Sequence, residues 1–247
     1  MRDLPEGTPH NGPADVAVAA RPGPRVAASL MCADLLNMGR DVEKLERAGA
    51  DLLHLDIMDG NFVPNLALSM ELGRQIKKVT RIPLDVHLMV TNPESYQSRI
   101  HDMKIDYASF HIESVQAPAR LVRTLKAGGT KVGIALNPCT GLDCLPWLIE
   151  ELDFVLLMTV EPGFAGQLFV KSVLGKIAAL RKLMMSHGVE VPIEVDGNIN
   201  AQTATWCVEN GASILVGGSS SVFRPGVDLA LAYRDFRREI AGLTCPI

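Results

Sequence analysis

Residues 54–65 read HLDIMDGNFVPN, and this stretch predicts a buried strand that ends in a turn. His54 and Asp56 are two residues apart, so their side chains point to the same face of the strand. A histidine and a carboxylate on a buried face need polar partners. The turn that follows is rich in Asp, Gly, Asn and Pro. We therefore expect polar side chains at the carboxyl end of a strand, beneath a loop.

Outward from this strand, short apolar runs alternate with amphipathic stretches. Eight strands are predicted, at residues 25–30, 52–57, 83–90, 107–112, 131–136, 154–158, 191–195 and 214–216. Eight helices are predicted, at residues 37–48, 69–78, 93–101, 117–127, 141–150, 170–187, 200–209 and 226–240. Strict alternation implies parallel strands joined by helical crossovers. An open doubly wound sheet would also alternate, but eight repeats in a chain of this length favour a closed (β/α)8 barrel.

The composition narrows the class of protein. The chain has 247 residues, 47% of them hydrophobic, which is enough to build one large domain. A net charge of -4 without a Lys/Arg cluster argues against a nucleic-acid partner. No apolar run approaches the roughly 18–20 residues of a membrane span, so no membrane partner is expected. Residues 1–24 are rich in Pro, Gly and Ala and are expected to form a mobile arm, with residues 25–247 forming a single barrel domain.

The N-terminus and the cysteines bear on where the protein works. The N-terminus lacks an apolar signal core, and Asp3, Glu6 and Asp15 argue against a transit peptide. The five cysteines are odd in number and scattered, as is typical of reduced thiols inside a cell. We therefore expect a cytoplasmic protein. A homo-oligomer is also expected, because closed assemblies are common among such proteins.

One group of polar residues collects where three predicted strands end. It consists of His54, Asp56, His87 and Asp196. Two imidazoles and two carboxylates suit one divalent metal ion of borderline hardness, with zinc as the first expectation and manganese, iron or cobalt as alternatives. The plainer interpretation is a set of buried polar groups that satisfy one another. Convergence of four such groups at one end of a barrel favours a metal.

A second group is rich in glycine and lies in the loops expected after the last three strands. It contains residues 163–166, Gly197, Gly217, Gly218 and Ser219. Any tight turn favours glycine, so each loop alone is a weak signal. Three neighbouring loops without Lys or Arg predict a phosphate held by main-chain N–H groups.

Other side chains also follow the predicted strand ends. Met31, Met58, Met89 and Met158 are expected beside the two groups. A methionine there ordinarily fills the core, and the alternative is an apolar, polarisable floor under a flat reacting group. The strand at 107–112 ends in a further polar stretch, FHIE at residues 110–113, which belongs to neither group.

Five stretches resemble the ribulose-phosphate 3-epimerase family. They are HLDIMDGNFVPN, DVHLMV, MTVEPGFAGQLF, EVDGNI and VGGSSSVF, and the resemblance spans residues 25–240. The stretches SLMC, DVHLMVTNPE and PGFAGQ, together with Asn137-Pro138, also resemble allulose-6-phosphate 3-epimerase, a relative that acts on a six-carbon ketose phosphate. The resemblance implies a (β/α)8 TIM barrel of the ribulose-phosphate-binding type, with a small ketose phosphate as its partner.

The resemblance also implies roles for the matching positions. One divalent metal would be held by His54, Asp56, His87 and Asp196, and the two aspartates would be catalytic. The implied substrate site comprises Ser29, Met58, His87, Met89, Met158, Gly163, Phe164, Ala165, Gly166, Gly197, Asn198, Gly218 and Ser219.

The implied reaction interconverts D-ribulose 5-phosphate and D-xylulose 5-phosphate. Asp56 would remove the proton at C3, the metal would hold the enediolate charge, and Asp196 would return a proton to the opposite face. One alternative is the same chemistry on allulose 6-phosphate or another hexulose or tetrulose phosphate. A second alternative is a non-catalytic phosphosugar-binding barrel.

Two positions depart from the family's pattern. Asn61 stands where His or a similar polar residue usually follows Asp-Gly, and Asn198 stands where the second glycine of EVDGG is usual. Asn tolerates the left-handed backbone conformation better than most residues, so the turn can persist. We expect the Asn198 side chain to crowd or reshape the phosphate loop. Both changes bear on the length of the substrate.

Overall fold

The computed structural model describes residues 23–245, and its centre is a closed barrel of eight strands in sequence order. The strands are β1 (Arg25–Ser29), β2 (Leu52–Met58), β3 (Leu84–Met89), β4 (Tyr107–His111), β5 (Lys131–Leu136), β6 (Phe154–Met158), β7 (Ile193–Asp196) and β8 (Ile214–Gly217). Every neighbouring pair is parallel, including β1 with β8. The predicted closed barrel is therefore confirmed, and an open doubly wound sheet is excluded.

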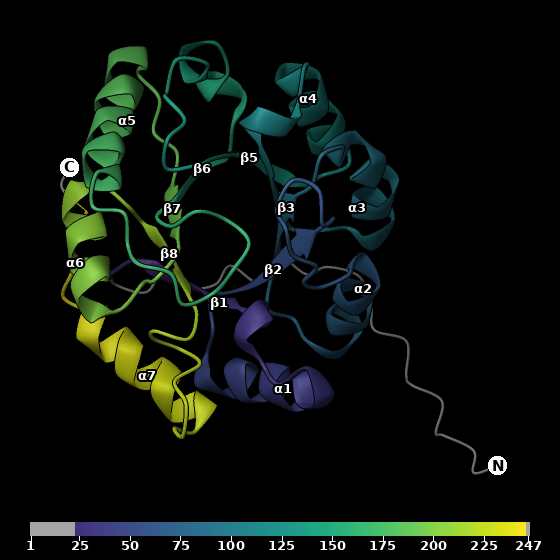
Figure 1. Cartoon of the computed structure of the whole chain (residues 1–247), viewed down its shortest axis with the longest axis vertical. Coiled ribbons are helices and arrows are strands. Elements are labelled where there is room, and N and C mark those ends of the chain that lie inside the picture. Colours follow the sequence, from purple (N-terminus) through teal and green to yellow (C-terminus); the bar gives the residue numbers. More distant parts are fainter. Residues whose placement is uncertain (1–22, 246–247) are drawn as a thin grey trace.

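Helices form a ring outside the strands (Figure 1). The α-helices within residues 23–245 are α1 (Met38–Ala48), α2 (Met70–Val79), α3 (Gln97–Met103), α4 (Pro118–Ala127), α5 (Val173–His187), α6 (Ala201–Asn210) and α7 (Leu229–Ile240). Short 3-10 turns are η1 (Leu30–Cys32), η2 (Leu35–Asn37), η3 (Pro93–Tyr96), η4 (Ile112–Ser114), η5 (Leu145–Trp147) and η6 (Ile149–Glu151). No helix in this part of the chain combines the length and apolar character that crossing a bilayer requires.

One predicted helix is wrong. The segment 141–150 forms the separate 3-10 turns η5 and η6 instead of an α-helix. Pro146 lies inside this segment, and it has no N–H to donate to the preceding turn. Proline also disfavours a helical backbone at the residue before it. The connection between β5 and β6 is therefore the least regular of the helical crossovers.

Helix ends follow capping rules that the sequence makes visible. The Ser69 hydroxyl accepts a hydrogen bond from the Leu72 N–H at the start of α2. Asn200 and Thr203 form a reciprocal capping box at the start of α6. These two caps fix where α2 and α6 begin, directly after loops that reach the carboxyl end of the barrel.

Strand alternation decides which side chains enter the barrel. Leu53, Leu55 and Ile57 of β2 belong to the main apolar core between the strands and the helices. His54 and Asp56 alternate with them and therefore point into the barrel. The β2–β3 register pairs Asp56 with His87, which places both side chains at one level.

The predicted N-terminal arm falls almost entirely outside the described residues. At its end, Arg237 of α7 donates a hydrogen bond to the main-chain oxygen of Pro24. The assignment of residues 1–24 to an arm and of residues 25–247 to a single domain stays a prediction.

Candidate active site

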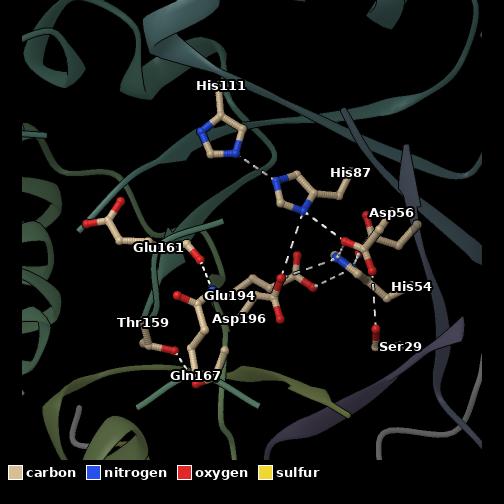
Figure 2. A network of polar contacts seen from close by, with 12 residues as sticks. Ser29, His54, Asp56, His87, His111, Thr159, Glu161, Gln167, Glu194 and Asp196 are labelled. Carbon is tan, nitrogen blue, oxygen red and sulfur yellow. Dashed lines mark hydrogen bonds and ion pairs between the residues drawn. The ribbon is translucent and has the colours of Figure 1, made fainter. Parts of the chain in front are cut away.

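The four polar residues predicted to hold a metal lie together at the carboxyl end of the barrel (Figure 2). His54 and Asp56 come from β2, His87 from β3 and Asp196 from β7. One side-chain nitrogen or oxygen of each lies within 4.8 Å of the others. Asp56 Oδ1 is 3.3 Å from His54 Nε2 and 3.3 Å from His87 Nδ1. Asp196 Oδ2 is 3.8 Å from His54 Nε2 and 3.9 Å from His87 Nδ1.

The donors in this cluster suit a divalent cation. His54 Nδ1 lies 2.6 Å from Asp85 Oδ2, so the ring donates there and its Nε2 faces the cluster. That Nε2 atom is buried and has no hydrogen-bond partner within residues 23–245. Burial acts to lower the pKa of His54, but the carboxylates of Asp56 and Asp85 raise it well above its usual value. The same negative potential that favours an imidazolium favours a metal ion among these atoms.

The two aspartates differ in acidity. Burial acts to raise the pKa of Asp56, but His54 and His87 outweigh it and lower this pKa below its usual range. Burial raises the pKa of Asp196 to about 7, opposed by His54 and reinforced by Asp56 and Asp85. Burial is also the main cause that lowers the pKa of His87 to about 4. Two carboxyl groups with separated pKa values at one site can act as a base and an acid.

A further pair of acids lies deeper in the barrel and was not predicted as part of the site. Asp85 and Glu194 flank His54, with Glu194 Oε1 3.6 Å from His54 Nδ1. Burial and the charge of Asp85 raise the pKa of Glu194 well above its usual value. Each acid lies two residues before a predicted metal-binding residue on the same strand face. This two-residue spacing is visible in the sequence. It does not identify the two acids as partners of His54, because the register between the strands is not known from the sequence.

A cavity that is open to solvent lies beside the cluster. Among the residues that line it are Ser29, Met31, Asp56, Met58, Met89, Met158, Gly163, Phe164, Ala165, Gly166, Asp196, Gly197, Asn198, Gly218 and Ser219. The predicted substrate-site residues thus line one cavity, with the exception of His87. His87 is fully buried and is not among the residues that line the cavity. The Ser29 hydroxyl donates to Asp56 Oδ2 at 3.2 Å.

The glycine-rich loops meet at one end of this cavity. Gly197 has a φ of 123°, and a Cβ there would lie 2.5 Å from Val160 Cγ2, so only glycine fits. Within residues 23–245, no acceptor takes the main-chain N–H groups of Asn198, Gly218 or Ser220. Unpaired N–H groups in such a turn form a site that an anion can occupy.

Asn198 connects two loops at this end of the cavity. Its φ of 50° is left-handed, so the turn persists as expected. Its Nδ2 donates to the Gln167 main-chain oxygen at 2.7 Å, and its Oδ1 accepts from Ser220 Oγ at 2.8 Å. The side chain therefore joins the loop after β6 to the turn after β8.

The loop after β6 is held from its other side as well. Asn65 Nδ2, from the loop after β2, donates to the Gly163 main-chain oxygen at 2.7 Å. Asn61, the other departure from the family's pattern, donates its main-chain N–H and its Nδ2 group to Asp59 in its own turn. Burial acts to raise the pKa of Asp59, but main-chain N–H donors including that of Thr91 lower it to about 2.

Comparison with known proteins agrees with the motifs and the geometry. A sequence model of the ribulose-phosphate 3 epimerase family matches residues 25–223. The chain belongs to the ribulose-phosphate 3-epimerase family. Ribulose-phosphate 3-epimerase of Methanocaldococcus jannaschii is 39% identical over 207 residues, which cover 84% of this chain and 88% of that protein. Its counterpart in Bacillus subtilis is 40% identical over 197 residues, which cover 79% of this chain and 91% of that protein.

Solved structures support the fold of this epimerase. KGPDC from Streptococcus mutans superposes with a TM-score of 0.68 at 10% identity, covering 90% of this chain and 99% of that one. Phosphoribosyl anthranilate isomerase from Thermus thermophilus gives a TM-score of 0.62 at 18% identity, covering 89% and 99%. At such identities the likeness establishes the barrel alone. Family membership makes the protein an isomerase of carbohydrate phosphates.

Proposed function

We propose that this epimerase inverts C3 of a ketose phosphate, with D-ribulose 5-phosphate and D-xylulose 5-phosphate as the first substrate pair. The observation that carries the proposal is the pairing of Asp56 and Asp196. Their carboxylates reach one cavity from β2 and β7, within 4.8 Å of each other, and their pKa values are displaced in opposite directions. Inversion requires that a proton leave one face of C3 and another arrive on the opposite face, and two acids of unequal pKa can divide that work.

The nitrogen and oxygen donors of the cluster suit one divalent metal, for which zinc is our first expectation. His54 would offer Nε2, His87 would offer Nδ1, and Asp56 and Asp196 would offer one oxygen each. When bound, the metal supplies positive charge beside the substrate carbonyl and favours the enediolate form of the sugar. Ser29 supports the site by donating to Asp56 Oδ2 and limiting the orientations of that carboxylate.

The opposite displacements of the two pKa values support one direction of proton transfer. Asp56, whose pKa is lowered, takes the C3 proton of ribulose 5-phosphate as the base. Asp196, whose pKa is raised, returns a proton to the other face of C3 as the acid. The reverse reaction exchanges the two roles. The methionines that line the cavity exclude water from the planar intermediate, which protects it from stray protonation.

The phosphate binds at the glycine-rich end of the cavity in this proposal. Unpaired N–H groups of Asn198, Gly218 and Ser220 surround that end. They supply hydrogen bonds without a lysine or arginine, as main-chain anion sites do. A six-carbon substrate is the second candidate, because SLMC and PGFAGQ resemble the allulose-6-phosphate enzyme. Asn198 lines the end of the cavity where the longer tail would have to fit, so it bears directly on this choice.

The test is a substrate panel on zinc-loaded protein. We expect the highest kcat/KM on D-ribulose 5-phosphate, compared with D-allulose 6-phosphate and a tetrulose phosphate, and loss of activity after chelation that zinc restores. Incorporation of solvent deuterium at C3 should accompany turnover. A preference for allulose 6-phosphate would select the second candidate. Binding of the sugar phosphates without C3 exchange would show a non-catalytic binder and overturn the proposal.

A homo-oligomer is part of the proposal. Leu35 and Leu36, in the loop after β1, and Leu66, in the loop after β2, are exposed by 62%, 95% and 73%. Exposed apolar side chains gathered in neighbouring loops are typical of an association surface. Light scattering coupled to size exclusion should give a mass above that of one chain, and a monomer at micromolar concentration would contradict this.

A further inference from the structure

His111 connects the candidate metal site to a part of the barrel that the proposed mechanism does not use. It is the last residue of β4 and is fully buried. Its Nε2 lies 2.9 Å from His87 Nε2. The two rings stack, with 5.1 Å between their centroids and an angle of 28° between their planes. The ring of Phe62, from the loop after β2, packs against His111 with 4.7 Å between the ring centroids. Figure 2 shows the line of contacts from His111 through His87 to the two aspartates.

Glu113 fixes the far end of this line. His111 Nδ1 lies 3.1 Å from Glu113 Oε2. The other carboxylate oxygen, Oε1, accepts hydrogen bonds from the Asn137 N–H at 2.9 Å and from the Thr140 hydroxyl. Burial acts to raise the pKa of Glu113, but these three donors outweigh it and lower the pKa to about 2. Glu113 is therefore an ionised group that only accepts hydrogen bonds.

The hydrogen-bond directions follow from Glu113 and from the contact distances. Glu113 accepts from His111 Nδ1–H, which leaves His111 Nε2 to accept from His87 Nε2–H at 2.9 Å. Asp56 Oδ1 competes for the same proton from the other side of the His87 ring, but its contact with His87 Nδ1 is longer, at 3.3 Å. The shorter contact favours the proton on Nε2, so that His87 Nδ1 offers a lone pair toward Asp56 and Asp196.

We propose that His111 and Glu113 are positioning residues that hold His87 as the Nε2–H tautomer, so that its Nδ1 lone pair is available to a divalent metal. The inference rests on the metal site of the proposed function. It also explains a difference between the two imidazoles of that site. His54 presents Nε2 because Asp85 takes its Nδ1 proton directly, whereas His87 presents Nδ1 because Glu113 acts on it through one intervening ring. Partners of this kind orient a metal-binding histidine and raise its basicity.

The first test needs no variant. Long-range nitrogen–proton NMR correlations of metal-free wild-type protein report which ring nitrogen of each histidine carries the proton. We expect His87 protonated at Nε2 and His111 protonated at Nδ1, and the same pattern after addition of zinc. A His87 ring protonated at Nδ1 in both states would overturn the inference.

The second test measures zinc affinity by competition with a chromogenic chelator. Glu113→Gln and His111→Phe should each weaken zinc binding by about 10- to 100-fold, the range found for partners of metal-binding histidines. In His111→Phe the His87 tautomer signal should become mixed. His101→Phe is the matched control, because His101 is a half-buried histidine of α3 that hydrogen-bonds to the Thr124 main-chain oxygen and is not part of the cluster, so zinc affinity should not change there.

The outcomes separate this inference from the proposed function. Zinc affinity within about twofold of wild type in both variants, with an unmixed His87 signal, would overturn the role of His111 and Glu113 and leave the metal site standing. A wild-type protein that binds no zinc, manganese or cobalt would overturn the metal site and this inference with it. Circular dichroism confirms that each variant is folded, and the wild-type NMR result decides the inference if a variant is not.

Discussion

Replacing Asn198 by glycine should loosen the loop after β6 without disturbing the barrel. The Asn198 side chain donates to Gln167 in that loop and accepts from Ser220 in the turn after β8. Asn198→Gly removes both hydrogen bonds but keeps a residue that adopts the left-handed φ of 50° readily. The substitution therefore separates the side-chain bridge from the backbone turn that it sits on.

The size of the effect follows from the one hydrogen bond that holds the loop. Opening of the loop breaks the bond from Asn198 to Gln167, which contributes about 1 kcal/mol, whereas the bond with Ser220 lies in the turn after β8 and is not broken. Global unfolding loses both bonds, and relief of the left-handed backbone, about 1 kcal/mol, offsets part of that loss. At 1.4 kcal/mol for each factor of ten, opening of the loop should become about 5-fold more frequent.

Hydrogen exchange measured by mass spectrometry checks this value. Amides of residues 163–168 should exchange about 5-fold faster in Asn198→Gly, while peptides of β2 and β3 stay unchanged. In the proposed function this loop lines the substrate cavity, so KM should rise and kcat should change less. Asn61→Gly is the matched control, since the hydrogen bonds of Asn61 within residues 23–245 go to Asp59 in its own turn. Unchanged exchange at residues 163–168 would refute the bridging role of Asn198.

Three further predictions address the acids, the packing and the pH dependence. Asp56→Asn and Asp196→Asn should each lower kcat for epimerisation by about 10²- to 10⁴-fold, although Asp196→Asn can still exchange the C3 proton of ribulose 5-phosphate through Asp56. Epimerisation above a tenth of the wild-type rate in either variant would contradict the two-acid mechanism. Gly73→Ala should destabilise the fold by about 1 kcal/mol in urea unfolding. The new Cβ would lie 2.7 Å from Leu55 Cδ2, and this crowding exceeds the gain in helix propensity. An unchanged unfolding midpoint would show that the Leu55 side chain can move aside at no cost. The folded-state pKa of Asp59 is about 2, below its unfolded value, so its contribution to stability is present above about pH 4 and is lost as the pH falls toward 2. Acid unfolding of Asp59→Ala should therefore show a weaker pH dependence than wild type between those values, and identical curves would rule this out.

Much of the fold was predictable because its signals are local. Runs such as residues 52–57 and 131–136 are short, apolar and bounded by turn residues, and all eight predicted strands occur. Residues 141–150 are the exception among the predicted helices. Their apolar spacing predicted an α-helix, but Pro146 interrupts the helical hydrogen bonds, and the chain forms two 3-10 turns instead.

The site was predictable to the extent that it depends on strand ends. His54 and Asp56 share a face by alternation, and parallel strands bring His87 and Asp196 to the same end of the barrel. The surrounding residues were not assignable in this way. His111 meets His87 only because of the β3–β4 register and a ring orientation that no periodicity encodes. The bridge made by Asn198 likewise depends on two loops whose paths are set by packing.

Closure of the barrel has a consequence for the order in which the enzyme can mature. β8 pairs with β1, so the seam between the first and last strands lies between β2, which carries His54 and Asp56, and β7, which carries Asp196. A nascent chain that ends before β7 holds three of the four cluster residues and lacks Asp196. The complete cluster can therefore form only after β7 has been synthesised, and an ion bound there would link strands on the two sides of the seam and slow its opening during unfolding.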